Sequence, residues 1–182
     1  MRAIYPGPNL SKRARQHTIY LYLLRGLRIE HLKQVWGVDI TYIRLRSGWI
    51  YLFTVLDLYS RFVVSWTFDL TLEIGFVLEP VRSALTTAML TICNSDQCSH
   101  LTCPQYTALF QDTPVPISMD GKGRALDNIF TERLWRTVKY EEICLKDYAS
   151  PREARSSLSV YLDFYNHRRL HQALDYQTPT SI

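Results

Sequence analysis

The sequence predicts an α/β fold in which a mixed five-stranded sheet carries helices on its faces. Two observations point to it. Three apolar runs follow one another between residues 35 and 70, and strand-like and helix-like patterns alternate from there onward. A strand meander followed by such alternation is typical of a mixed sheet. The chain has 182 residues, of which 47% are hydrophobic and 21% charged, so it is long enough to bury one core as a single domain.

The first three strands are expected in residues 35–45, 49–60 and 61–70. These segments read "VWGVDITYIRL", "WIYLFTVLDLYS" and "RFVVSWTFDL", and they are rich in the β-branched and aromatic residues that favour strands. The intervening "RSG" is a tight-turn signal. We therefore expect three successive antiparallel strands.

Helices and strands are expected to alternate in the rest of the chain. Residues 71–90 have helical periodicity, and Pro80 predicts a kink or break within them. The last helix begins with a capping box, in which Ser150 is the N-cap and Glu153 follows three residues later. Between them we expect strands in 90–93 and 115–119 and helices in 104–111 and 126–145. The complete order is that of the ribonuclease H-like arrangement.

The composition indicates a short basic arm followed by one core domain. Residues 1–33 carry a Pro-Gly-Pro turn and the basic run Lys12, Arg13 and Arg15, and are expected to form a linker or arm. Residues 34–182 are expected to form the core. The net charge of +4 permits a nucleic-acid partner without requiring one.

Signals for secretion or membrane insertion are not apparent in the sequence. The N-terminus has no apolar core, and "IYLYLLRGL" is too short and too charged to span a bilayer. Four cysteines in a chain without a secretory signal indicate reduced thiols. We therefore expect a soluble cytoplasmic protein without a membrane partner.

Two aspartates stand out from the chain's other acids. Asp39 sits in mid-strand with apolar residues on both faces, where an unpaired carboxylate costs several kcal/mol or becomes protonated. A metal ion, a basic partner or a buried ion pair would each resolve this. Asp96 follows the fourth strand, at the kind of strand end where ligands of α/β sheets gather, although position alone favours a plain loop aspartate in an Asn-Ser-Asp turn.

A third acid, Glu132, lies on the long helix expected in 126–145. It shares a helix face with Asn128, Arg136 and Lys139, opposite an apolar stripe. A surface ion pair between Glu132 and Arg136 would explain it without any function. Alternatively, this face looks into a cleft where its cations meet phosphates. The apolar stripe is made of Phe130, Leu134, Val138 and Leu145.

Taken together, the three acids and several sequence blocks resemble a known family. Thirty-five residues separate Asp96 from Glu132, and Asp39 lies upstream. The blocks "WGVDITYI", "GWIYLFTVLDLYSR", "NSDQ", "KGRALDNIFTERLWRTVKYEE" and "YNHRRLHQAL" occur in the same order as in the family. From Val35 to Pro179, the chain resembles the orfB-type transposases of bacterial insertion sequences (insertion-sequence family three) and the DDE core of retroviral integrases.

The resemblance implies an enzyme that cleaves DNA and transfers strands. Asp39, Asp96 and Glu132 would bind two Mg²⁺ or Mn²⁺ ions, which prefer oxygen ligands. Water or a DNA 3′-hydroxyl would attack phosphorus in line. The partners would be element ends and target DNA, bound by a homo-oligomer in the bacterial nucleoid, with a helix-turn-helix region that is separate or missing. The residues expected to contact DNA are Lys122, Arg124, Asn128, Arg136, Lys139, Arg168 and Arg169.

The cysteines bear on two alternatives. Zinc binding is disfavoured because Cys93, Cys98 and Cys103 lack the close pairs of structural zinc sites.

Cys98 stands where the family has glycine, and a positive φ there would strain the loop of Asp96 by roughly 1–2 kcal/mol. A catalytically inactive DNA-binding remnant therefore stays an alternative. A nuclease acting on RNA–DNA hybrids or branched DNA is another.

Overall fold

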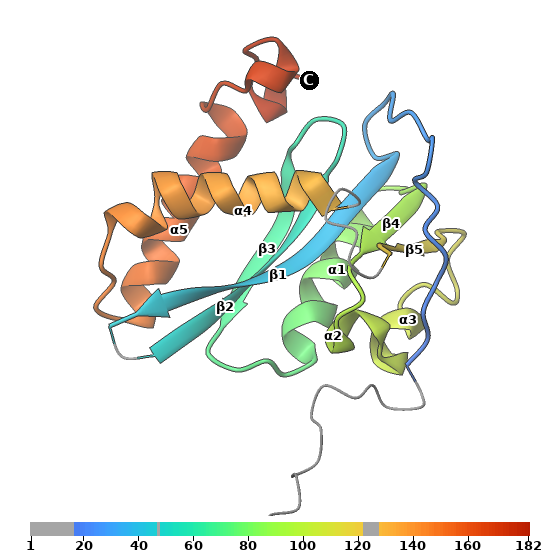
Figure 1. The fold of residues 1–182 in the computed structure, drawn as a ribbon, viewed down its shortest axis with the longest axis horizontal. Helices are drawn as coiled ribbons and strands as arrows, with labels where there is room; N and C mark the ends of the chain where they lie inside the picture. The colour runs from blue at the N-terminus through green and yellow to red at the C-terminus, as the bar shows by residue number, and fades with distance from the viewer. Residues whose placement is uncertain (1–16, 47, 122–127) are drawn as a thin grey trace, which may run out of the picture.

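The structure is built around one five-stranded mixed sheet (Figure 1). It is a computed structural model that describes residues 17–46, 48–121 and 128–182. The strands lie in the order β3-β2-β1-β4-β5, which confirms the predicted fold class. The strands are β1 Val35–Leu45, β2 Gly48–Asp57, β3 Val63–Asp69, β4 Ile92–Ser95 and β5 Ile117–Met119.

Strand β1 lies at the centre of the sheet and joins an antiparallel half to a parallel half. β2 pairs antiparallel with β1, and β3 with β2, as predicted. On the other side β4 pairs parallel with β1, and β5 parallel with β4. Parallel strands end at the same edge, and Val38 pairs with Ser95, so β4 ends beside the middle of β1.

Helices cover both faces of the sheet (Figure 1). Val35 and Ile43 of β1 point into a core shared with α4 and α5. Trp36 and Val38 point into a second core, shared with α1, α2 and α3. None of the helices in the described residues has the length and apolar character needed to cross a bilayer. The helices are α1 Gly75–Thr87, α2 Ser99–Thr102, α3 Pro104–Ala108, α4 Ile129–Glu141 and α5 Pro151–His167, with short 3₁₀ turns at Ile143–Leu145, Gln172–Leu174 and Pro179–Ser181.

Helix α1 runs through Pro80 without a break, so a break there is wrong, and a kink stays a prediction. Pro80 is the sixth residue of the helix, and its ring is buried in the core. Without a backbone N–H, Pro80 cannot donate to the carbonyl of residue 76, so one hydrogen bond of the first turns is lost. Burial of the apolar ring offsets part of that cost.

Helix α4 is shorter than its sequence pattern predicts. It ends at Glu141, and Leu145 lies in the following 3₁₀ turn with 74% of its surface exposed. Leu145 therefore does not belong to the apolar stripe. The residues that α4 buries are Thr131, Leu134, Trp135 and Val138.

Helix α5 begins with the predicted capping box. The Ser150 hydroxyl accepts a hydrogen bond from the backbone N–H of Glu153 at 3.2 Å. The Glu153 carboxylate in turn accepts one from the backbone N–H of Ala149 at 2.8 Å. The reciprocal bond thus goes to the residue before the N-cap, and Pro151 opens the helix as expected.

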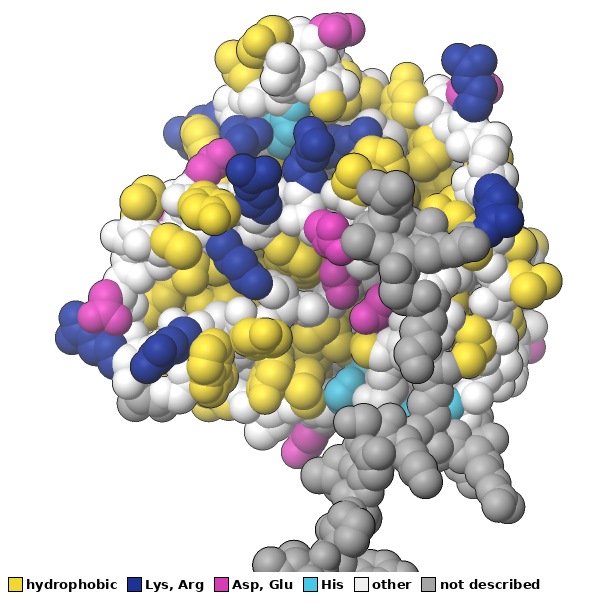
Figure 2. All heavy atoms as spheres, viewed as in Figure 1, with side chains coloured by type: hydrophobic (Ala, Val, Ile, Leu, Met, Phe, Trp, Pro, Cys, Tyr) yellow, Lys and Arg dark blue, Asp and Glu magenta, His cyan; other side chains and the backbone are white. Residues whose placement is uncertain are grey.

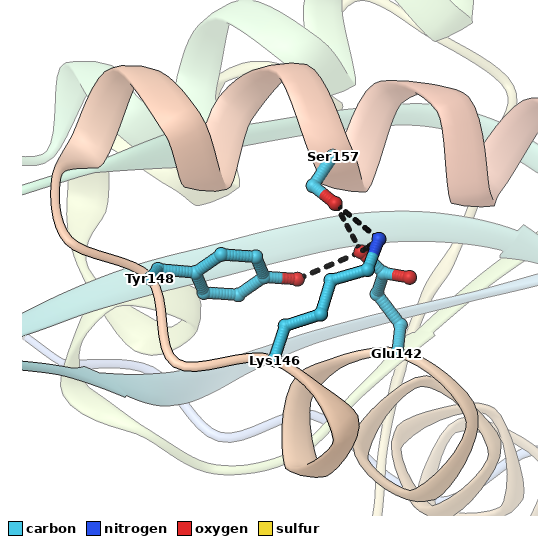
Figure 3. A network of polar contacts seen from close by, with 4 residues as sticks. All are labelled: Glu142, Lys146, Tyr148 and Ser157. Carbon is cyan, nitrogen blue, oxygen red and sulfur yellow. Dashed lines mark hydrogen bonds and ion pairs between the residues drawn. The ribbon is translucent and has the colours of Figure 1, made fainter.

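A buried polar cluster fastens the end of α4 to α5 (Figure 3). The Glu142 carboxylate, 4% exposed, accepts hydrogen bonds from the Tyr148 hydroxyl at 2.8 Å and from Lys146 Nζ at 2.8 Å. The Ser157 hydroxyl of α5 donates to the same oxygen of Glu142. This cluster fixes where α4 ends, and therefore how the helix crosses the sheet.

The chain before β1 packs along the edge of the sheet near β5 (Figure 1). Thr18 donates a backbone hydrogen bond to Thr102 at 3.1 Å, and the N–H of Leu23 donates to the Ser118 hydroxyl at 3.0 Å. Residues 17–33 thus lie against the domain, and the boundary at residue 33 stays a prediction. The basic run at 12–15 lies outside the described residues.

Candidate active site

The Asp39 carboxylate lies in the middle of β1 and contacts α4. Its Oδ1 accepts a hydrogen bond from the backbone N–H of Ile40 at 2.8 Å. Its Oδ2 accepts one from the indole Nε1 of Trp135 at 2.9 Å and one from Asn128 Nδ2 at 3.3 Å. Within the described part of the chain, no lysine or arginine forms an ion pair with Asp39. The buried ion pair that the sequence left open is therefore not formed there.

The environment of Asp39 makes ionisation of its carboxyl group less favourable. Burial is the main reason that its pKa is raised from 3.8 to about 6, and the negative charge of Asp96 acts in the same direction. The hydrogen bonds from Trp135, Ile40 and Asn128 lower the pKa but do not cancel the burial. The influence of Asp96 means that the two carboxylates repel each other across adjacent strands. A cation between them would relieve both effects.

Asp96 directly follows β4, at the C-terminal edge of the parallel half of the sheet. Val38 of β1 pairs with Ser95 of β4, and the next step along that register brings Asp39 opposite Asp96. The Asp96 Oδ1 accepts a hydrogen bond from the backbone N–H of Cys98 at 3.0 Å. Asn94 and Ser95 thus belong to the end of the strand and not to the turn considered from the sequence, and Asp96 follows the strand beside Asp39.

Cys98 does not strain the loop that carries Asp96. Its backbone lies at φ −68° and ψ 160°, an extended conformation open to any residue, so the expected strain is wrong. Its N–H donates to Asp96, and burial together with the Asp96 charge raises the pKa of its thiol to about 12. The thiol therefore stays neutral beside the carboxylate.

The other two cysteines of this region have separate surroundings. The buried Cys93 thiol lies 3.6 Å from the Tyr106 hydroxyl, and burial raises its pKa to about 12. Cys93 is thus the small buried side chain that its strand position predicts. Cys103 donates from its Sγ to the carbonyl of His100 at 3.2 Å.

The first turn of α4 packs very closely on β1. A Cβ atom on Gly37 would lie 3.1 Å from the Thr131 methyl and 2.9 Å from Leu58. Any side chain at position 37 would have to push Leu58 and Thr131 aside, so the glycine favours this close approach. Asn128, just before the helix, contacts both the Thr131 hydroxyl and the Asp39 carboxylate. The turn that carries Glu132 is thus fixed next to Asp39.

Glu132 is exposed on the first turn of α4, one turn after Asn128. Figure 2 shows acidic side chains gathered in the middle of this face, below the N-terminal end of α4. Among the described residues, no three His, Cys, Asp or Glu side chains form a group that could hold a metal ion. The structure brings Asp39 and Asp96 together, and it places Glu132 on the adjoining helix turn without completing a three-ligand cluster.

Cations on the exposed face of α4 contact aromatic rings. Glu132 and Arg136 do not form the surface ion pair considered above, and the Arg136 guanidinium lies 5.9 Å from the Tyr140 ring. Lys139 Nζ lies 5.6 Å from the ring of Tyr42 on β1. Both cations stay available to phosphates.

The remaining predicted DNA contacts fall in different places. Arg169 pairs with Glu141 at 2.8 Å, and it lines the same cavity as Glu132. Arg168 is exposed at the end of α5 and lines a separate hollow with residues of that helix. The structure therefore does not bring Arg168 to the three acids. Lys122 and Arg124 lie outside the described residues.

Trp135 is the site residue whose role the sequence did not predict. It is 7% exposed and packs in the core, yet its indole N–H reaches the Asp39 carboxylate. The helical pattern places Trp135 one turn after Glu132, beside the apolar stripe. That position predicts burial, but it does not predict a hydrogen bond to β1.

Comparisons of the chain with known proteins agree on one family. Two family models, both described as "Integrase core domain", match residues 30–125 and 113–179. The "Transposase for insertion sequence element IS904" of Lactococcus lactis is 29% identical over 150 residues, which cover 80% of this chain and 59% of that protein. The "Transposase InsF for insertion sequence IS3A" of Escherichia coli is 29% identical over 142 residues, covering 76% and 49%. The chain thus spans about half the length of these curated relatives.

Solved structures with a similar fold come from retroviruses. The catalytic core domain of the HTLV-2 integrase, in a dimeric form with magnesium, superposes with a TM-score of 0.65 at 12% identity, covering 83% of this chain and 96% of that one. A simian T-cell lymphotropic virus intasome chain gives 0.67 at 17% identity, covering 88% and 57%. At these identities the likeness establishes the ribonuclease H-like fold.

Proposed function

Because the chain belongs to the integrase core domain family, we propose that it is the catalytic core of an insertion-sequence transposase that cleaves DNA and joins DNA ends to a target. The observation that carries the proposal is the Asp39–Asp96 pair. Two carboxylates meet across adjacent parallel strands, and one of them, Asp39, is partly buried, with a pKa of about 6 and no ion-paired cation in the described residues. The transposases among its relatives support the same reaction class.

The carboxylates fit two Mg²⁺ or Mn²⁺ ions, with Asp39, Asp96 and Glu132 as the ligands. Hard divalent ions take oxygen donors, and Mg²⁺ is commonly held by one or two carboxylates together with substrate phosphates. The Asp39–Asp96 pair supplies such a donor set, and Glu132 adjoins it on α4. When bound, the ions supply an activated attacking oxygen and a stabilised leaving oxygen for in-line displacement at phosphorus.

The chain's own residues orient the carboxylates and the DNA. Trp135 and Asn128 hold the Asp39 carboxylate in one orientation and leave it ionised at neutral pH. Arg136 and Lys139, whose partners are aromatic rings, would bind backbone phosphates on the face of α4. We extend the DNA-binding surface to Lys122, Arg124, Arg168 and Arg169 by family resemblance.

Further aspects of the proposal concern the whole protein. We propose that it acts as a homo-oligomer on element ends, in the bacterial nucleoid, and that a helix-turn-helix region recognises the terminal sequences. The dimeric form of the HTLV-2 integrase core supports the oligomer. A strained Cys98 loop was one reason for the inactive alternative, and the extended Cys98 backbone removes that reason.

The test is a joining assay that does not need the terminal sequence in advance. Duplexes with randomised ends and free 3′-hydroxyls are incubated with plasmid and 5 mM Mg²⁺, a concentration of about the order that such sites require, and joined products are sequenced. We expect joining by the wild type and its loss, by at least about 100-fold, in Asp39→Asn and Glu132→Gln. Glu79→Gln, a surface change on α1, is the matched control.

Two results would contradict the proposal. Cleavage of RNA–DNA hybrids or branched DNA without any joining would identify a structure-specific nuclease. DNA binding without any metal-dependent reaction, equal in wild type and Asp39→Asn, would identify an inactive remnant.

A further inference from the structure

A cavity of about 680 Å³ lies between α4, the end of α5 and the segment that follows α5. Four arginines line it: Arg61, Arg133, Arg136 and Arg169. His171 and Phe130 also line it, and we call it the arginine pocket. Figure 2 shows Lys and Arg side chains gathered on this part of the surface, above α4.

Two buried nitrogen atoms of the pocket have no hydrogen-bond partner in the described part of the chain: Arg61 Nη1 and His171 Nε2. The Arg61 guanidinium lies 3.8 Å from the Phe130 ring, which holds it in place but accepts no conventional hydrogen bond. Buried polar atoms without partners are rare, and Arg61 Nη1 is a donor for which a bound anion would supply the acceptor. Arg61 also has φ +65°, a left-handed conformation that is uncommon for non-glycine residues.

The field in the pocket is positive. Burial, together with the charges of Arg169 and Arg61, lowers the pKa of His171 to about 4. Burial and the charge of Arg133 lower the pKa of Arg61. Two carboxylates also line the pocket, but Glu141 is already bound by Arg169, at 2.8 Å, and by the Tyr161 hydroxyl. The exposed Glu132 alone does not neutralise the remaining arginines.

We propose that the arginine pocket binds a phosphate group, supplied by the DNA backbone of a strand that crosses α4. The proposal rests on the proposed function for its DNA source, and on the pocket itself for its phosphate chemistry. Guanidinium forks match phosphate oxygens, and Arg61 Nη1 would gain the acceptor it lacks. The volume exceeds that of a single ion and accommodates the sugar that a backbone phosphate carries.

The pocket adjoins the candidate active site through α4. Glu132 lines the pocket, while Asn128, one turn earlier, contacts Asp39. A strand that leaves the carboxylates along this helix therefore reaches Arg133 and then Arg61. The pocket would hold a phosphate beyond the reacting one, and so set where the strand lies.

The first test compares two arginine substitutions on exposed helix positions. Arg133→Gln lies in the pocket, and Arg152→Gln, on the first turn of α5, lies outside it. Affinity for a fluorescent duplex is measured from 50 to 200 mM salt. We expect Arg133→Gln to reduce the slope of log K against log salt by about 1, and Arg152→Gln to leave it unchanged. Equal slopes for both variants would contradict the proposal.

The second test observes the His171 ring by NMR, which does not depend on catalysis. A bound phosphate should raise the pKa of His171, because it neutralises the surrounding arginines. Duplex DNA and inorganic phosphate are added in separate titrations. A rise with DNA alone identifies the backbone as the source, and a rise with both identifies a general phosphate site. Absence of a rise with either, or an equal rise in Arg61→Gln, would overturn the proposal.

The two proposals fail in different ways. Joining by the wild type with unaltered salt slopes and an unresponsive His171 would remove the arginine pocket and leave the transposase function. A responsive His171 and a reduced salt slope, in a chain that never joins DNA, would support the arginine pocket and contradict the transposase function.

Discussion

The surroundings of the Asp39 carboxylate disfavour its ionised form. It sits in a buried strand, near a second carboxylate, and its hydrogen-bond donors are the neutral groups of Trp135, Asn128 and Ile40. Its ionised form is therefore less favourable in the fold than in the unfolded chain. This is the pattern expected where a site is kept for its chemistry at the expense of stability.

We therefore predict that Asp39→Asn stabilises the fold at neutral pH. The folded-state pKa, about 6, exceeds the ordinary 3.8, so the folded protein binds more protons than the unfolded one between these values and loses stability as pH rises. The full penalty, up to ~3 kcal/mol, is present above about pH 7 and absent below about pH 4. Thermal unfolding should show Asp39→Asn melting roughly 2–8 °C higher at pH 7.5.

The control for this prediction is Asp163→Asn on the surface of α5, which should shift the melting temperature very little. The gain of Asp39→Asn should shrink at pH 4. A variant that melts below the wild type at pH 7.5 would mean that the carboxylate is stabilised by its surroundings, contrary to the raised pKa.

At the residue scale, sequence reasoning identified the unusual acid but not its partners. The alternation of β1 places apolar residues on both sides of Asp39, and that was enough to single it out. The contact with Trp135 joins residues 96 positions apart and depends on how closely α4 crosses β1. That closeness is decided by the absent side chain of Gly37. Residue periodicity contains no information on such distances.

Contacts at both ends of helix α4 fix its position on the sheet. At the first turn, Thr131 packs on Gly37 beside Asp39. At the last turn, the Glu142 cluster joins the helix to Tyr148 and Ser157. The cluster is buried and charged, with Lys146 only partly covered. Breaking such a cluster on one side leaves its other members without partners, which costs more than the cluster itself contributes.

We predict that Glu142→Ala lowers the free energy of unfolding by about 2–4 kcal/mol, because it leaves the buried Tyr148 hydroxyl without its hydrogen-bond acceptor. Urea denaturation measures it. Asp147→Ala, which breaks an exposed ion pair with Arg46, should cost less than about 1 kcal/mol. Similar costs for the two variants would show that the cluster does not tie α4 to α5.

At the element scale, the types of the elements were predictable and their ends were less so. Apolar runs and helical periodicity identified the strands and the long helices, although the fourth strand was placed two residues too early. The capping box located the start of α5 to the residue. The end of α4 was extended too far because Leu145 continues the apolar spacing. In the structure the buried residue near that end is Glu142, whose partners come from another helix and from the loop before it.

Across the whole molecule, the candidate site depends on the mixed sheet. Asp39 comes from the antiparallel meander and Asp96 from the parallel half, and they meet because β1 belongs to both. Glu132 is added by a helix packed across the same face. A cation that binds the pair would therefore couple three parts of the fold and stabilise the molecule as a whole.

We predict that Mn²⁺ raises the melting temperature through Asp96. At about 10 mM Mn²⁺ and a millimolar dissociation constant, binding adds roughly 1–1.5 kcal/mol, or about 2–6 °C. The shift should disappear in Asp96→Asn and persist in Asp112→Asn, an exposed aspartate outside the site. It should also weaken below pH 6, where Asp39 becomes protonated. An equal shift in both variants would place the bound ion elsewhere.

The contact between Trp135 and Asp39 has a consequence for when the protein can act. The two residues are 96 positions apart, so the chain must be synthesised to the middle of α4 before the Asp39 carboxylate can accept the hydrogen bond from Trp135. Contacts of such long range form late, after the loops between them close. An unfinished or partly folded chain therefore lacks the arrangement of carboxylates that the proposed reaction requires.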